Sequence, residues 1–131
     1  MNLRKLALIA TFAALAVGAG LAHAGSVSNQ TVGFSTTSTG LEAASGGVRA
    51  TRNSADTVQY IGCVRYTYDT GSNSALCYAK NAAGTLKQCT TNDPNMMRAA
   101  ELMNSMSFLS FAINADGTCD RVIVTNTSFN L

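Results

Sequence analysis

Four cysteines constrain the fold of this chain more than any other feature of its sequence. The cysteines are Cys63, Cys77, Cys89 and Cys119, and no two of them form a C-x-x-C pair. An even number of cysteines in a short exported chain predicts disulfides, whereas a cytosolic chain with four cysteines more often binds a metal. Structural zinc sites contain closely spaced cysteine pairs, which this chain lacks. We therefore expect two disulfides and no metal site if the chain is exported.

Residues 1–24 have the pattern of a secretory signal peptide. Arg4 and Lys5 precede an apolar stretch, and Ala22-His23-Ala24 has the small-x-small pattern that signal peptidase accepts before Gly25. The apolar stretch is shorter than the roughly 20 residues that span a bilayer. We expect cleavage after Ala24, a secreted or periplasmic location, and no stable membrane insertion after cleavage.

Cleavage at this position changes the composition of the remaining chain. The nine basic residues include Arg4 and Lys5, so the mature chain has seven basic and seven acidic residues. The only histidine, His23, is also removed. A neutral surface without clustered cations argues against nucleic-acid binding. The lack of imidazole excludes histidine-based nucleophile systems and histidine-ligated metals, and we expect no cofactor.

The clearest strand signals follow residue 56. β-branched and aromatic residues predict strands at 58–68, 75–80 and 85–90, and turn residues separate the three segments. Short connections between successive strands favour antiparallel neighbours. We predict a three-stranded antiparallel meander.

A helix and a second hairpin follow. Asp93-Pro94 is a favoured helix start, and the apolar residues after it recur at helical spacing, which predicts a helix over 94–104 that covers one face of the sheet. Strands are expected at 107–113 and 118–125, joined by a turn at 114–117 that contains an Asp-Gly pair. The predicted fold over residues 56–131 is α+β, a small antiparallel sheet with one helix and a C-terminal β-hairpin, stapled by two disulfides.

Residues 25–55 are dominated by Ser, Thr, Gly, Asn and Ala and carry no long apolar stripe. Residues 31–35 alternate weakly between apolar and polar, and residues 47–51 read as a short edge strand. We expect a loosely ordered N-terminal arm or edge strands that pack through Val32 and Phe34.

The hairpin turns limit how the cysteines pair. A turn centred near residue 70 places Cys63 opposite Cys77, and a turn centred near residue 83 places Cys89 opposite Cys77 as well. We favour Cys63–Cys77 with Cys89–Cys119, because this pairing joins the meander to the C-terminal hairpin. The alternative is Cys77–Cys89 with Cys63–Cys119.

The aromatic residues of the meander are tyrosines. Tyr60, Tyr66 and Tyr68 share a parity on one strand, so they project from the face opposite Cys63, and Tyr78 joins them from the neighbouring strand. With Arg65 or Lys80 nearby, such a surface suits contacts with a protein or a glycan. Alternatively, these rings complete the core beneath the helix or the N-terminal arm.

Part of the chain resembles a known group of proteins. The pattern runs from Cys77-x-Ala79-x-Asn81-Ala82-x-Gly84 through Cys89-x-Thr91-x-Asp93-Pro94 to Asp116-Gly117-x-Cys119. With it, residues 60–128 resemble small exported four-cysteine proteins of Gram-negative bacteria that have no established function. The resemblance implies a shared fold and brings no catalytic residues with it.

These features together favour a non-enzymatic exported protein that acts as a binding module through its sheet surface, in the manner of an inhibitor. Its expected partner is a protein or a glycan, and self-assembly into a homo-oligomer is a further expectation. One alternative is a small secreted hydrolase with paired carboxylates, which requires two acids to converge in a cleft. Another is a structural component of the cell surface.

Overall fold

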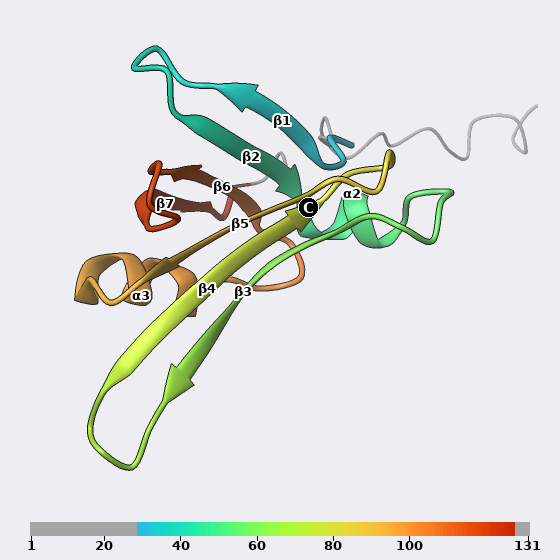
Figure 1. Ribbon diagram of the computed structural model, residues 1–131. Helices are drawn as coiled ribbons and strands as arrows, with labels where there is room; N and C mark the ends of the chain where they lie inside the picture. Colours follow the sequence, from blue (N-terminus) through green and yellow to red (C-terminus); the bar gives the residue numbers. More distant parts are fainter. Residues whose placement is uncertain (1–28, 128–131) are drawn as a thin grey trace, which may run out of the picture.

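A computed structural model describes residues 29–127, so the predicted signal peptide and its cleavage site lie outside the described residues. The described part contains two helices and seven strands (Figure 1). In chain order these elements are β1 (Gly33–Thr36), β2 (Glu42–Gly47), α2 (Val48–Arg52), β3 (Tyr60–Thr67), β4 (Asn73–Lys80), β5 (Leu86–Thr91), α3 (Pro94–Glu101), β6 (Phe108–Ile113) and β7 (Cys119–Thr125).

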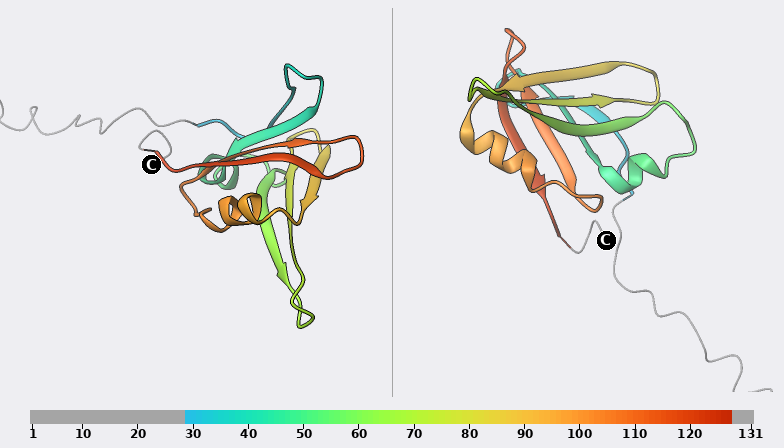
Figure 2. Two further views of the ribbon diagram at one scale, coloured as in Figure 1. Left: turned by 90° about the vertical axis from the view of Figure 1, so that its left-hand side faces the viewer. Right: turned by 90° about the horizontal axis from the view of Figure 1, so that it is seen from below.

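The strands form two antiparallel sheets. One sheet has the order β1-β2-β6-β7 and the other has the order β3-β4-β5. The distal part of the β3–β4 hairpin projects beyond the rest of the molecule, as Figure 1 and the left view of Figure 2 show. The predicted α+β class, meander, helix and C-terminal hairpin are confirmed, but the hairpin belongs to a second sheet.

The turns of the meander explain its register. The Tyr68 N–H donates to Ser72 O at 3.0 Å, and the Asn81 N–H donates to Thr85 O at 3.1 Å. Gly71 has φ of 78°, a left-handed conformation that other residues rarely adopt and that a tight turn requires. The first turn fixes β3 and β4 in a register that places Cys63 opposite Cys77, and the second fixes β4 and β5 in a register that places Cys77 opposite Cys89.

Helix α3 begins where the sequence predicts and ends earlier. The Asp93 carboxylate accepts hydrogen bonds from the N–H groups of Asn95 and Met96, both at 2.9 Å, and so caps the helix. The helix ends at Glu101 rather than near residue 104. Beyond it, the Asn104 N–H donates to Ser107 Oγ at 2.8 Å, and this bond holds the chain in the turn that leads to β6.

The N-terminal segment is more regular than its composition suggests. The predicted edge-strand position fits β1, whereas β2 lies inside its sheet between β1 and β6. The prediction of loose order is therefore wrong for residues 42–47. The edge strand predicted at 47–51 is also wrong, because Val48–Arg52 forms α2. Small residues in β2 permit close packing: a Cβ at Gly46 would lie 3.2 Å from Thr31 O.

The core lies between the two sheets. Phe111 and Leu109 of β6 are fully buried, as are Cys77 and Cys89 of the three-stranded sheet. Val32 and Phe34 both pack against this cluster, as the sequence predicts. Because two of the largest buried side chains are half-cystines, the disulfides are part of the core rather than surface cross-links.

Candidate binding surface on the three-stranded sheet

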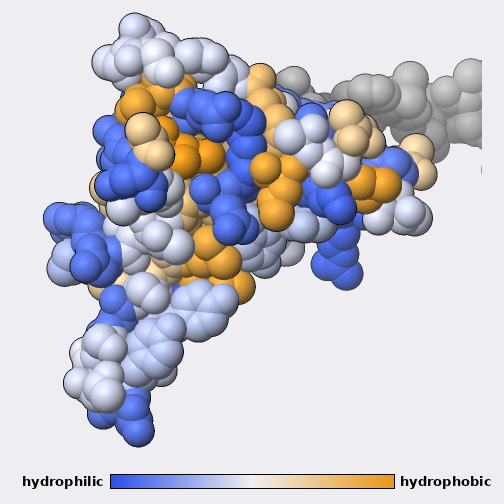
Figure 3. Space-filling view, in the orientation of Figure 1, coloured by the Kyte–Doolittle hydropathy of each residue, from blue (hydrophilic) through white to orange (hydrophobic). Residues whose placement is uncertain are grey.

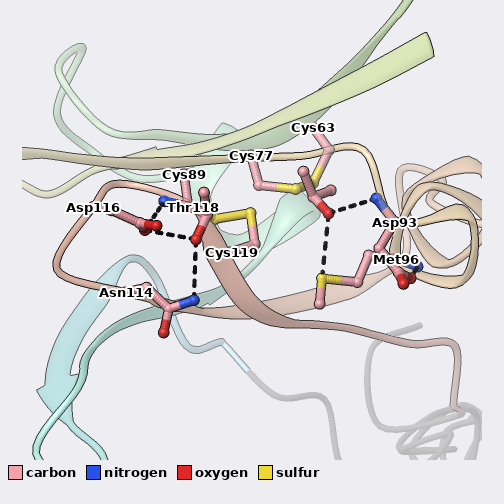
Figure 4. Close-up of a disulfide and its surroundings, with 10 residues drawn as sticks. Cys63, Cys77, Cys89, Asp93, Met96, Asn114, Asp116, Thr118 and Cys119 are labelled. Carbon is pink, nitrogen blue, oxygen red and sulfur yellow. Dashed lines mark hydrogen bonds between the residues drawn. A yellow bond between two sulfur atoms is a disulfide. The ribbon is translucent and has the colours of Figure 1, made fainter. Parts of the chain in front are cut away.

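Both disulfides have the favoured pairing, Cys63–Cys77 and Cys89–Cys119, and no cysteine within residues 29–127 is free (Figure 4). Cys77 lies opposite Cys63 on one side and opposite Cys89 on the other. Both cysteines are thus neighbours of Cys77, and proximity along the sheet does not by itself explain why Cys77 pairs with Cys63 rather than with Cys89.

Hydrogen-bond alternation explains which neighbour Cys77 takes. In an antiparallel ladder, hydrogen-bonded and non-hydrogen-bonded residue pairs alternate along the strands. Tyr68 and Ser72 are hydrogen-bonded, and counting from them along β3 and β4 makes Cys63 and Cys77 a non-hydrogen-bonded pair. Asn81 and Thr85 are also hydrogen-bonded, and counting from them along β4 and β5 makes Cys77 and Cys89 a hydrogen-bonded pair. Side chains are closer in non-hydrogen-bonded pairs, and the Cα atoms of Cys63 and Cys77 are 4.0 Å apart.

The second disulfide fastens the two sheets to each other. Cys89 lies on β5 and Cys119 opens β7, and the Thr90 N–H beside it donates to Gly117 O at 3.1 Å. In Figure 4 this disulfide lies next to the turn that Asn114, Asp116 and Thr118 stabilise with side-chain hydrogen bonds. One disulfide thus joins the first two strands of the meander to each other, and the other joins its third strand to β7.

The two faces of the three-stranded sheet differ in burial. The face toward the core carries Cys77, Cys89, Ala75 and Ala79, all fully buried. We call the other side the outward face, defined by the even-numbered residues from Tyr60 to Tyr68, from Ser74 to Lys80 and from Leu86 to Thr90. Its exposed large side chains include Val64 and Leu86.

The four predicted tyrosines lie together on the outward face as two pairs. Tyr60 and Tyr78 meet edge to face, with ring centroids 5.7 Å apart, and Tyr66 and Tyr68 are stacked at 6.4 Å. Tyr60 and Tyr66 are 42% exposed and Tyr68 is 50% exposed. These three rings therefore do not complete the core beneath the helix. In the space-filling view, apolar side chains are visible among polar ones above the projecting hairpin (Figure 3).

Arg65 does not belong to the outward face, and its predicted place beside the tyrosines is wrong. An odd-numbered residue of β3 projects toward the core side of the sheet, and there the guanidinium forms an ion pair with Glu101 at the end of α3. The cation of the outward face is Lys80, whose Nζ lies 5.9 Å from the centre of the Tyr60 ring. The parity that groups the tyrosines also separates them from Arg65.

A shallow depression of about 470 Å³ lies on the outward face, lined by Tyr60, Tyr78, Leu86 and Gln88. Sequence reasoning missed the contribution of β5 to this surface. The signal was available, because Leu86 and Gln88 have the parity that the register aligns with Lys80 and Tyr78.

Two more hollows bear on the hydrolase alternative. One, of about 540 Å³, contains Asp56, and the other, of about 460 Å³, contains Asp93. Asp93 caps α3. The side-chain amide of Gln59 and the N–H groups of Gln59 and Val58 bind the Asp56 carboxylate and lower its pKa to about 2. Each hollow thus holds one carboxylate, already engaged by the fold.

Nothing within residues 29–127 clusters three potential metal ligands, and no helix in this range is long and apolar enough to cross a membrane. A scan against protein-family models found no match, and neither the curated proteins nor the solved structures include a significant match. The resemblance of residues 60–128 to exported four-cysteine proteins stays a prediction.

Proposed function

We propose that this chain is an exported, non-enzymatic binding protein and that the outward face of the three-stranded sheet is its contact surface. The observation that supports this proposal is the exposure of tyrosines together with Val64 and Leu86 on one open sheet face. Tyrosine provides apolar contact area and a hydroxyl for hydrogen bonding, and it is enriched in protein interfaces.

The surface is held rigidly, which favours binding. The Cys63–Cys77 disulfide joins β3 to β4 beneath the outward face, and Cys89–Cys119 joins β5 to the other sheet. A preorganised surface loses little conformational entropy when it binds. Two disulfides also suit the oxidising compartment that the predicted signal peptide implies.

A protein partner suits this face better than a charged ligand. Lys80 is the only charged residue among the residues that define the outward face. The centre of a protein interface is typically depleted in charge and enriched in aromatic side chains. The hydrolase alternative has less support, since the hollows that hold Asp56 and Asp93 each contain a single, structurally engaged carboxylate.

The proposal can be tested by affinity capture from extracts of the compartment to which the chain is exported. The variant Val64→Asp/Leu86→Asp places two charges on the outward face and should lose the captured protein. The control is Ile123→Asp, because Ile123 on β7 of the other sheet is 47% exposed, the same as Leu86. The control should capture the partner as wild type does.

Equal capture by wild type and by the face variant would contradict the proposal. Binding of wild type to a glycan array that the face variant loses would replace the protein partner with a glycan. Non-reducing peptide mapping and circular dichroism of each variant establish that the disulfides and the fold are intact.

A further inference from the structure

Strand β3 has an open edge. Within residues 29–127 it pairs with β4 alone. Because its even-numbered residues exchange hydrogen bonds with β4, the N–H and C=O groups of its odd-numbered residues point away from the sheet. Near the projecting end these residues are Arg65 and Thr67, and residues 64–67 are exposed on both faces of the hairpin. This segment therefore offers backbone donors and acceptors to another strand.

The remaining sheet edges carry features that discourage strand addition. β1 is only four residues long. β7 follows a register irregularity at Ala112/Ile113 and carries Asp120 and Arg121. At the edge of β5, the Thr90 N–H is taken by Gly117 O. Short edge strands, bulges, charges and covering loops are the usual protections of an edge.

Over its exposed residues 64–67, β3 lacks these protections; Met103, whose methyl carbon would lie 3.7 Å from a Cβ at Gly62, covers only the earlier part of the strand. The strand spans eight residues with no proline and no lysine, and its sequence is rich in residues that favour strands. Its one charged residue, Arg65, is paired with Glu101 of the same chain, and both side chains stay partly exposed. This edge therefore carries a single cation, which an incoming strand can meet with any residue other than a second cation.

We propose that two copies of this chain associate through their β3 strands, antiparallel, with a two-fold axis at Tyr66. The two three-stranded sheets then form one continuous six-stranded sheet. Arg65 of each copy lies opposite Thr67 of the other, so the outward-pointing backbone groups of both residues are satisfied. Tyr66 faces its own counterpart, and Val64 faces Tyr68.

This register is favoured over its two neighbours. A two-fold axis at Arg65 would place two guanidinium groups directly opposite each other, and like charges in that position are destabilising. An axis at Thr67 would place Arg65 opposite Asp69, which belongs to the turn and has left the extended conformation. With the axis at Tyr66, aromatic and β-branched side chains face each other on the outward face, and such pairs stabilise sheets.

Sedimentation velocity of the oxidised mature protein over a range of concentrations tests the proposal. Wild type should show a concentration-dependent dimer. Thr67→Pro removes an outward N–H that β4 does not use and should give a monomer. The matched control is Gln88→Pro, which removes an outward N–H from the edge of β5 and should leave the dimer unchanged.

The register has a separate test that does not depend on tolerance of proline. Tyr66→Cys places two thiols across the two-fold axis in a non-hydrogen-bonded pair, so air oxidation should give a covalent dimer on a non-reducing gel. Leu86→Cys, with similar exposure on the same face, should stay monomeric on the gel. A wild-type monomer at every concentration would overturn the proposal, as would a dimer that survives Thr67→Pro and is lost in Gln88→Pro.

The outcome is separable from that of the proposed function. Thr67→Pro leaves Val64, Leu86 and the tyrosines in place, so loss of the dimer with retained capture of a protein partner would support both statements. Retained dimer with no captured partner would support self-association alone.

Discussion

Lys87 Nζ lies 2.6 Å from Glu42 Oε1, so an ion pair links β5 of one sheet to β2 of the other. The same ammonium group lies 5.4 Å from the centre of the Phe34 ring on β1. The Lys87 side chain is 17% exposed, whereas Glu42 is largely exposed. One lysine thus contacts two strands of the opposite sheet, one by charge and the other by its position over an aromatic ring.

Replacing Lys87 with methionine should lower the free energy of unfolding by about 1 kcal/mol, because an exposed ion pair contributes about 0–1 kcal/mol and a cation–π contact about 0.5–1 kcal/mol. Urea titration followed by circular dichroism measures the change. Glu42→Gln should cost less, since it leaves the cation over Phe34 intact. Unchanged stability of Lys87→Met would show that this lysine does not fasten the sheets.

Helix α3 depends on its cap. Asp93→Ala should lower the free energy of unfolding by about 1 kcal/mol, because the N–H groups of Asn95 and Met96 lose their acceptor. Asp93→Asn keeps an acceptor oxygen and should retain most of the stability. Denaturant titration of the three proteins measures the order. If the alanine and asparagine variants were equally stable, the capping role would be contradicted.

The two disulfides should contribute unequally. Cys63 and Cys77 are separated by 14 residues in sequence, and Cys89 and Cys119 by 30. In the chain-entropy view the first disulfide contributes about 3 kcal/mol and the second about 4 kcal/mol. The double alanine variant of the second pair should therefore have the lower urea midpoint. The opposite order would contradict the loop-length account, because the Cys89–Cys119 pair is also the more buried of the two.

Asp56 should make stability depend on pH in the acid range. Its pKa is about 2 in the folded protein against an ordinary value of 3.8, because Gln59 and Val58 donate hydrogen bonds to the carboxylate. Ionisation of Asp56 therefore stabilises the folded state relative to the unfolded state. This stabilisation is fully present above pH 3.8 and is lost as the pH falls toward 2.

The variant Asp56→Asn measures this effect. Wild type should be more stable than the variant at pH 5, and the difference should shrink as the pH is lowered to 2. Carboxyl-carbon NMR of wild type gives the midpoint for Asp56 directly. A midpoint near 3.8 would contradict the prediction.

Much of the meander could be read from the sequence because its signals are local. The Tyr68–Ser72 turn and the alternation of β3 fix the strand register, and the Asp93 cap fixes the start of α3. The disulfide pairing could also be predicted from the sequence, because the Tyr68–Ser72 turn places Cys63 opposite Cys77 in a non-hydrogen-bonded pair. The tyrosine face follows from parity alone, and the same parity applied to Arg65 would have removed that residue from it.

The first two strands could not be read in this way. β2 has the sequence Glu-Ala-Ala-Ser-Gly-Gly, which has little intrinsic preference for a strand. It is a strand because Ala44 packs in the core and Gly46 allows the segment around Thr31 to approach closely. Local sequence patterns contain no information on such contacts with distant residues, so they could not predict the four-stranded sheet or its packing against the meander.

The position of β2 between β1 and β6 also has a consequence in time. Ribosomes deliver a chain from its N-terminus, so β2 is made well before the strand that completes its pairing. The β1–β2 hairpin must wait, with one side unsatisfied, until the meander, α3 and β6 have all been made. The larger sheet therefore closes late, and non-local closure of this kind is slow.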